Sequence, residues 1–305
     1  MVSSRVPKIE WLTIFIISLV YTILGTLVWF HAIIPWWVIL PIGAYTACLH
    51  SSLQHEVLHG HPTRNRGVNE ALVFVTPHLW LPYGRYRDTH LAHHNDAHLT
   101  CPVQDPESYY LLPESWEAMA GPKKILYRFN NTLFGRMSIG PAVGMIRFWF
   151  AEFQKIYSGE YRLLKCWSLY FLSSFLVLSY VAWCGMPIWQ YIVLIAYPAI
   201  SLALVRSFCE HQAVADVGAR TIVVEASPFW SLLFLNNNLH IAHHDRPSLP
   251  WYTLPEFYKN RRDEFLQKNH NYIMNGYREI FRRYFFVCKE PVYHPNLEWL
   301  RGKET

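Results

Sequence analysis

Charged residues are scarce in this chain of 305 residues, where Asp, Glu, Lys and Arg together make up 16% of the sequence. Four stretches contain none of them: residues 11–30, 36–53, 166–184 and 188–205. Each stretch is about as long as a helix that crosses a lipid bilayer. Because uncharged runs of this length are rare in water-soluble folds, a soluble enzyme with four buried helices is disfavoured.

The chain also lacks a C-x-x-C pair and a signal-peptide cleavage site. Its six cysteines are scattered single thiols, which disfavours both a disulfide framework and a thiolate metal site. Residues 11–30 continue into further apolar sequence without a small-residue cleavage motif, so we expect them to remain as a membrane helix. The net charge of +5 gives no indication of nucleic-acid binding in a chain of this composition.

Lysine and arginine are absent from the short turns 31–35 and 185–187. Two of these residues precede position 11, twelve lie between the second and third uncharged stretches, and thirteen follow the fourth. Positive side chains that flank transmembrane helices remain on the cytoplasmic side. Tryptophans gather near the two turns, as in the aromatic belt of a membrane surface, at Trp29, Trp36, Trp37, Trp183 and Trp189.

We therefore predict an all-α membrane protein that forms a single domain over residues 1–305. Four transmembrane helices form two hairpins in this prediction. A helical cap of residues 54–165 and 206–305 faces the cytoplasm together with both termini.

Histidine, in contrast, is abundant, and three groups of histidines have close spacings. They are an H-x-x-x-H group at His55 and His59, and two H-x-x-H-H groups at His90, His93 and His94 and at His240, His243 and His244. On a helix these spacings place the imidazoles of a group on one face. Imidazole is the commonest metal ligand among side chains, and eight of them exceed the needs of one tetrahedral zinc. The sequence therefore predicts a site for two metal ions.

Several further residues are candidates for this site. His211 follows the fourth uncharged stretch, where we expect it to lie near His55 as a ninth ligand. Three histidines are either additional ligands or structural residues: His50, His61 and His98. Asp88 and Asp96 either orient ligand imidazoles or are solvated charges. The asparagines at 236–238 either cap a helix or hold a metal-bound water.

The order of these groups and of the uncharged stretches resembles that of the integral-membrane fatty acid desaturase superfamily, which also includes hydroxylases and carotenoid ketolases. The resemblance covers residues 11–258 and extends to the proline-rich segment 247–255. It implies a mushroom-shaped fold with two irons in the cytoplasmic cap and no catalytic side chain beyond the ligands. Those ligands, carried over by position, are His55, His59, His90, His93, His94, His211, His240, His243 and His244.

The resemblance implies an O2-dependent fatty-acyl desaturase that introduces a double bond into an alkyl chain lying in an apolar channel. A hydroxylase, a carotenoid ketolase or a terminal-alkene-forming oxidase of the same superfamily is the alternative. We expect a separate electron donor of the ferredoxin, rubredoxin or cytochrome b5 type, and a location in a bacterial inner membrane. Two departures leave the subfamily open: Glu56 stands where many desaturases have Asp, and His61 is an additional histidine.

Two interpretations from other classes compete with an oxidase. Residues 55–59 form an H-E-x-x-H pattern, in which Glu56 is the general base of a membrane zinc peptidase. A metal transporter or sensor without catalysis needs polar residues along its membrane helices. The uncharged stretches offer little besides Ser, Thr, Tyr and His50 for such a path.

Overall fold

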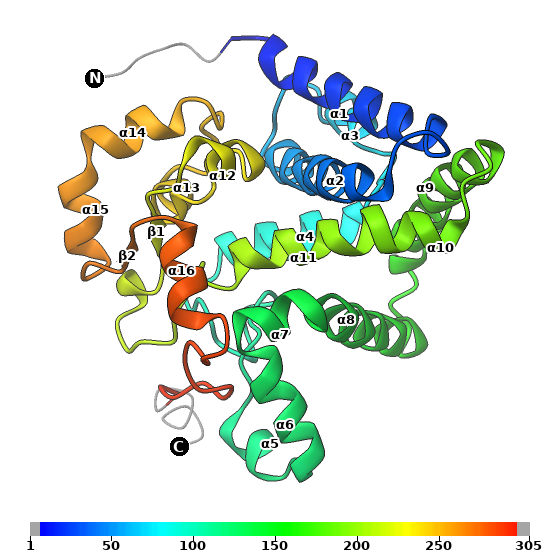
Figure 1. Cartoon of the computed structure of the whole chain (residues 1–305). Coiled ribbons are helices and arrows are strands. Elements are labelled where there is room, and N and C mark those ends of the chain that lie inside the picture. The colour runs from blue at the N-terminus through cyan, green and yellow to red at the C-terminus, as the bar shows by residue number, and fades with distance from the viewer. Residues whose placement is uncertain (1–6, 298–305) are drawn as a thin grey trace.

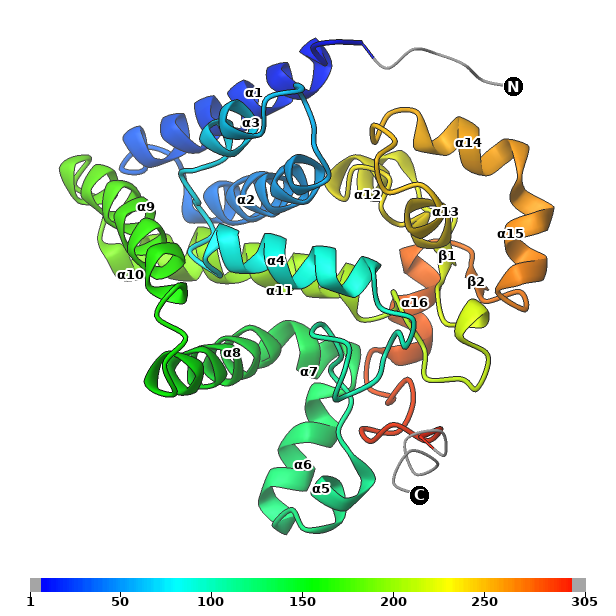
Figure 2. The ribbon, with the colours of Figure 1, turned by 180° about the vertical axis from the view of Figure 1, so that it is seen from behind.

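The computed structural model describes residues 7–297, and this part of the chain is mostly helical (Figures 1 and 2). Helix α1 spans Trp11–Trp29, α2 spans Trp36–Leu58 and α9 spans Leu163–Trp183. A continuous helical run consists of α10 (Ile188–Tyr191), the π-helical segment η1 (Ile192–Ala196) and α11 (Tyr197–Ser207). All four uncharged stretches therefore form helices, as predicted.

Three of these helices are long and apolar enough to cross a membrane: α1, α9 and the run Ile188–Ser207. Helix α2 is longer than predicted, because it continues through the first histidine group to Leu58. Polar residues such as Thr46, His50 and Gln54 are buried along it. These side chains lower the mean hydropathy of α2, so the fourth transmembrane helix and the double-hairpin arrangement stay predictions.

Helix α2 lies at the centre of the helical assembly, packed against α1, η1 and α11 (Figure 1). Its close approach to η1 depends on Gly43. A Cβ atom at this position would lie 2.7 Å from Cγ1 of Ile195, which is closer than carbon atoms pack. Glycine at 43 therefore sets the spacing between the helix that carries His55 and the one that leads to His211.

The α1–α2 turn and the α9–α10 turn lie at the same end of the molecule (Figure 1). Trp29 is the last residue of α1, and Trp183 is the last residue of α9. Their rings are in edge contact, with centroids 5.4 Å apart. The five tryptophans near these turns are all exposed: Trp29, Trp36, Trp37, Trp183 and Trp189. Exposed tryptophans at one end of apolar helices are typical of a membrane interface.

The remaining helices surround α2 and α11 and form two groups along the chain (Figures 1 and 2). The first group comprises α3 (Arg66–Leu72), α4 (Tyr83–His94), α5 (Pro113–Glu117), α6 (Gly121–Asn130), α7 (Leu133–Ser138) and α8 (Gly140–Tyr157). The second group comprises η2 (Val217–Ala219), α12 (Pro228–Leu233), α13 (His240–Asp245), α14 (Leu254–Asn260), α15 (Arg262–Lys268) and α16 (Tyr277–Tyr284).

A small parallel sheet joins distant parts of the second group. Strand β1 (Val223–Val224) pairs with β2 (Ile273–Met274), with Val223 opposite Ile273. This sheet departs from the predicted all-α class. Strands of two residues are too short to produce the alternating hydrophobic pattern by which a sequence predicts a strand.

A buried ion pair connects α4, which carries the second histidine group, to α8. The guanidinium of Arg85 donates through Nε and Nη2 to the carboxylate of Glu152, at 2.5 and 2.9 Å. Glu152 is only 1% exposed, so its charge depends on compensation by its partners, the largely buried Arg85 and the partly exposed Lys155. The two-point contact fixes the orientation of both side chains and thereby the position of α4.

We predict that Glu152→Gln lowers the apparent Tm of the detergent-solubilised protein by several degrees. Removing one partner of a buried ion pair typically costs about 3–5 kcal/mol, because the other charge stays buried. Lys155→Gln is the matched control, since Lys155 also contacts Glu152 but is a partly exposed side chain. Equal Tm values for the Glu152→Gln variant and the wild type would show that this ion pair does not hold α4 in place.

Candidate metal centre

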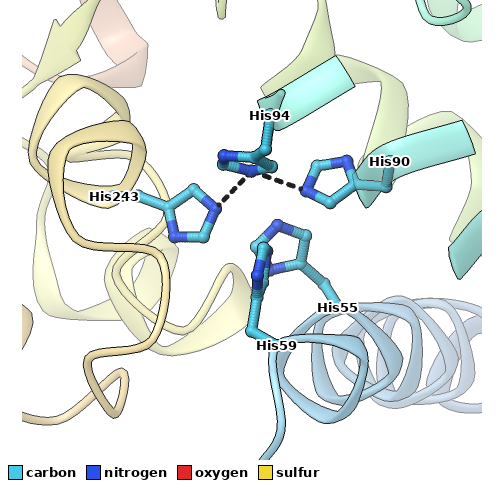
Figure 3. Close-up of side chains that lie close together, drawn as sticks. All are labelled: His55, His59, His90, His94 and His243. Carbon is cyan, nitrogen blue, oxygen red and sulfur yellow. Dashed lines mark hydrogen bonds between the residues drawn. The ribbon is translucent and has the colours of Figure 1, made fainter. Parts of the chain in front are cut away.

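The nine histidines predicted as ligands converge from four separate parts of the chain into two adjacent clusters. The first cluster consists of His55, His59, His90, His94 and His243 (Figure 3). The second cluster consists of His93, His211, His240 and His244. Within each cluster, one nitrogen of every ring lies within 4.8 Å of one nitrogen of every other ring.

In the first cluster, side chains from three helices point toward a common centre (Figure 3). Helix α2 contributes His55 and His59 at its C-terminal end, where one helical turn separates them. Nε2 of His94 lies 3.0 Å from Nε2 of His90 and 3.0 Å from Nε2 of His243. Nε2 of His59 is buried and has no hydrogen-bond partner among the described residues.

The second cluster has its own short contacts between ring nitrogens. Nε2 of His211 lies 3.1 Å from Nε2 of His93 and 3.2 Å from Nε2 of His240. His244 is 3.2 Å from His240, measured between the same atoms. The structure thus places His211 with histidines of both H-x-x-H-H groups, in the cluster that does not contain His55, whereas the sequence analysis expected it near His55.

Each H-x-x-H-H group is divided between the two clusters. On α4, His90 and His94 belong to the first cluster, and His93 belongs to the second. On α13 the division is reversed, because only His243 enters the first cluster. The rings of His94 and His244 stack with centroids 4.2 Å apart, so the clusters adjoin. The expectation that all imidazoles of a group face one common centre is therefore too simple.

Three ring nitrogens on the outer side of the clusters have oxygen partners. Nδ1 of His93 lies 2.8 Å from Oδ1 of Asp105, and Nδ1 of His90 lies 3.0 Å from Oε2 of Glu107. Nδ1 of His240 donates to Oδ1 of Asn237 at 2.9 Å. Such contacts fix the ring orientation and place the hydrogen on Nδ1, which leaves Nε2 free to bind a metal ion.

The two aspartates that the sequence suggested for this orienting role have other partners. Asp88 pairs with Arg87, and Asp96 accepts a hydrogen bond from the backbone N–H of His98. Asp105 and Glu107 lie in the irregular segment after α4, so no helical spacing connects them to their histidines. Their contacts with His93 and His90 form because this segment folds back onto α4, and the sequence alone does not indicate that path.

The ring nitrogens are arranged as metal ligands are. In the neutral form of His90 and His240, the hydrogen lies on Nδ1, so the Nε2 lone pairs point at other Nε2 atoms 3.0–3.2 Å away. Nε2 of His94 and Nε2 of His211 each contact two other Nε2 atoms, and the single hydrogen that such a nitrogen can carry serves only one of them. Two nitrogens each about 2.1 Å from one ion, at right angles, are about 3.0 Å apart. The donor atoms and their spacing therefore fit a metal ion in each cluster.

The electrostatic surroundings differ between two neighbouring histidines of α4. Burial and the neighbouring imidazoles lower the pKa of His94 to about 2, so its lone pair stays available. Burial also opposes protonation of His93, but the hydrogen bond to Asp105 and the charges of Glu107 outweigh it. The pKa of His93 is consequently raised to about 9. The carboxylates that favour a charged imidazole also favour a bound cation.

The other candidate histidines lie outside both clusters. Nε2 of His50 contacts the hydroxyl of Tyr21 at 2.9 Å, within the helical bundle. Nδ1 of His61 contacts Oε1 of Glu10 at 2.5 Å. His98 follows α4 in an irregular turn and belongs to neither cluster.

Glu56 faces away from the two clusters. Its Oε1 accepts a hydrogen bond from the backbone N–H of Trp251 at 2.9 Å and lies 3.8 Å from Nε2 of His61. Glu56, His61 and Glu10 together form a separate buried group. A zinc peptidase requires this glutamate beside the metal-bound water, so the geometry disfavours that interpretation.

A cavity of about 290 Å³ adjoins the two clusters. Four histidines of the two clusters line it: His90, His93, His211 and His240. Aromatic side chains form part of its wall, but so do charged side chains of both signs: Arg136, Arg206, Asp105, Glu107 and Glu210. The wall is therefore mixed, in contrast to the apolar channel expected from the sequence.

Comparison with known proteins gives the family. The family described as Fatty acid desaturase matches residues 29–276, which include every histidine of the two clusters. The chain belongs to this family, which confirms the resemblance inferred from the histidine groups. Membership places it among membrane-bound oxidoreductases of the desaturase and hydroxylase type. A search of curated proteins finds no match.

We predict that Asp105→Asn weakens metal binding about 10- to 100-fold, the usual effect of removing a carboxylate that orients a ligand histidine. The measurement is metal retained per chain during titration with a chelator. Asp88→Asn serves as the control, because Asp88 pairs with arginine at the surface of α4. An equal loss in both variants would show that Asp105 has no particular role in orienting His93.

Proposed function

We propose that the protein is an O2-dependent oxidase that uses two irons held by the nine histidines of the two clusters. The observation that supports this most directly is the convergence of Nε2 atoms at ligand spacing, in a chain that belongs to the fatty acid desaturase family. A pair of irons bound here supplies the oxidising power to break an unactivated C–H bond, which side-chain acid–base chemistry does not provide.

The protein's own residues hold and orient this centre. Asp105, Glu107 and Asn237 fix three of the rings from outside, and burial of the clusters limits the access of water. The adjoining cavity positions the substrate beside His93, His211 and His240. Such positioning determines which carbon is oxidised, because misplacement by about an ångström is enough to change the rate strongly.

Desaturation of a fatty-acyl or related alkyl chain is the activity we propose first. Hydroxylation, ketone formation or terminal-alkene formation on such a chain uses the same centre and is the alternative. Mass spectrometry of the product distinguishes them, since a desaturated product has lost two hydrogens and a hydroxylated one has gained an oxygen. A product that contains only added oxygen would overturn the desaturase assignment and leave the oxidase assignment intact.

We further propose that α2 completes four transmembrane helices in two hairpins, with the clusters and both termini on the cytoplasmic side. The exposed tryptophans at the two turns support this arrangement, as does the absence of Lys and Arg from these turns. Electrons reach the centre from a separate protein donor of the ferredoxin, rubredoxin or cytochrome b5 type in this proposal. The membrane is a bacterial inner membrane.

We predict about two irons per chain in protein purified after iron-replete expression, and one or fewer in His93→Ala and His243→Ala. Each substitution removes a ligand from a different cluster. Iron and zinc are counted by elemental analysis of the solubilised protein. His270→Gln is the control, because His270 is an exposed histidine that contacts Asp216 and belongs to neither cluster.

Two results would contradict the proposal. One zinc per chain without iron would favour hydrolytic chemistry over oxidation. Unchanged iron content in both alanine variants would show that the clusters do not bind the metal.

A further inference from the structure

Arg136 is a buried arginine at the wall of the cavity that adjoins the two clusters. It lies on α7, a short helix packed against α11 (Figure 1). The side chain is 8% exposed, and the cavity that it lines also reaches His93, His211 and His240. A cation at this position is therefore close to where the substrate is oxidised in the proposed function.

Arg136 has no acidic partner. Its Nε donates to the backbone carbonyl of Asn130 at 3.1 Å, and its guanidinium lies over the ring of Tyr109, 4.8 Å from the centroid. Within residues 7–297, no carboxylate forms an ion pair with Arg136, and its two terminal nitrogens donate no hydrogen bond. The other arginine of the cavity differs, because Nε of Arg206 lies 2.7 Å from Oε1 of Glu210.

An unpaired buried guanidinium is unfavourable. Transfer of a charge from water into a protein interior costs several kcal/mol unless an opposite charge compensates it, and a stacked aromatic ring offsets only about 0.5–2 kcal/mol. Burial accordingly lowers the pKa of Arg136. Since the side chain lines a cavity, the missing anion can come from a bound molecule.

We propose that Arg136 binds the carboxylate of the substrate, which enters the cavity as a free carboxylic acid. A guanidinium matches a carboxylate in a two-point contact, which provides both affinity and orientation. The inference rests on the proposed function, because it names the class of substrate that the histidine clusters oxidise. An ester or a thioester lacks the negative charge that Arg136 requires.

The size of the cavity also restricts the length of the substrate. Arg136 lines the same cavity as His93, His211 and His240, so the carboxylate and the oxidised carbon of a bound acid share this space. A cavity of about 290 Å³ is at the small end of the range for ligand sites. Short and medium-chain acids fit these limits better than long ones.

The test is calorimetric titration of the full-length protein in lipid nanodiscs with octanoate and with its uncharged methyl ester. We expect octanoate to bind at least tenfold more tightly than the ester. Arg136→Gln should abolish this preference, and Arg136→Lys, which keeps the charge but not the two-point geometry, should reduce it less. Empty nanodiscs correct for partitioning into lipid.

Arg147→Gln is the matched control. Arg147 is an exposed arginine on the neighbouring helix α8, stacked over Tyr127 and absent from the cavity wall. Its removal should leave the affinity for octanoate unchanged. Circular dichroism and gel filtration of each variant show whether it is folded, and Arg136→Lys provides the comparison if the Gln variant is not.

Three results would overturn the proposal: equal affinities for octanoate and the ester, no binding of octanoate, or full affinity in Arg136→Gln. Because binding is measured without turnover, this test is independent of the iron count. A carboxylate site in a protein without iron would contradict the proposed function alone. Two irons without carboxylate selectivity would contradict the role of Arg136 alone.

Discussion

The structure depends on one unfavourable arrangement, in which nine imidazoles meet in a buried space with short distances between their ring nitrogens. Neutral imidazoles with facing lone pairs repel each other, and the low dielectric of a protein interior screens this repulsion only weakly. The fold brings them together through helices that are held from outside, by the contact of Asp105 with His93 and by the ion pair between Arg85 and Glu152. Metal ions convert this repulsion into attraction, which is why the donor set fits them.

The membrane-type helices and the cap contribute to this arrangement in different ways. Helix α2 delivers His55 and His59 from the end of a long apolar segment, so their positions follow from the packing of α2 against α1, η1 and α11. The shorter helices α4 and α13 and the segment after α11 supply the other seven histidines of the two clusters. The clusters therefore lie at the boundary between the long helices and shorter elements joined by loops.

The helices and the convergence of the histidines could be predicted because their signals are local. Uncharged runs are contiguous, and the spacing of His90, His93 and His94 is visible within one helical turn. The orienting role of Asp105 and the unpaired state of Arg136 could not be predicted, since both depend on how irregular segments fold back. The division of each histidine group between two clusters could not be predicted either. Helical spacing shows that the imidazoles share a face, but it does not show whether that face borders one cluster or two.

This division has a mechanical consequence. Helix α4 offers His90 and His94 to one cluster and His93 to the other, and α13 does the reverse. A movement of either helix therefore shifts histidines of both clusters at once. In the proposed two-metal centre, ordering α4 and α13 around the first ion would also order histidines of the other cluster, which would lower the free-energy cost of filling the second site. Half-filled protein should consequently be a minor species under metal limitation.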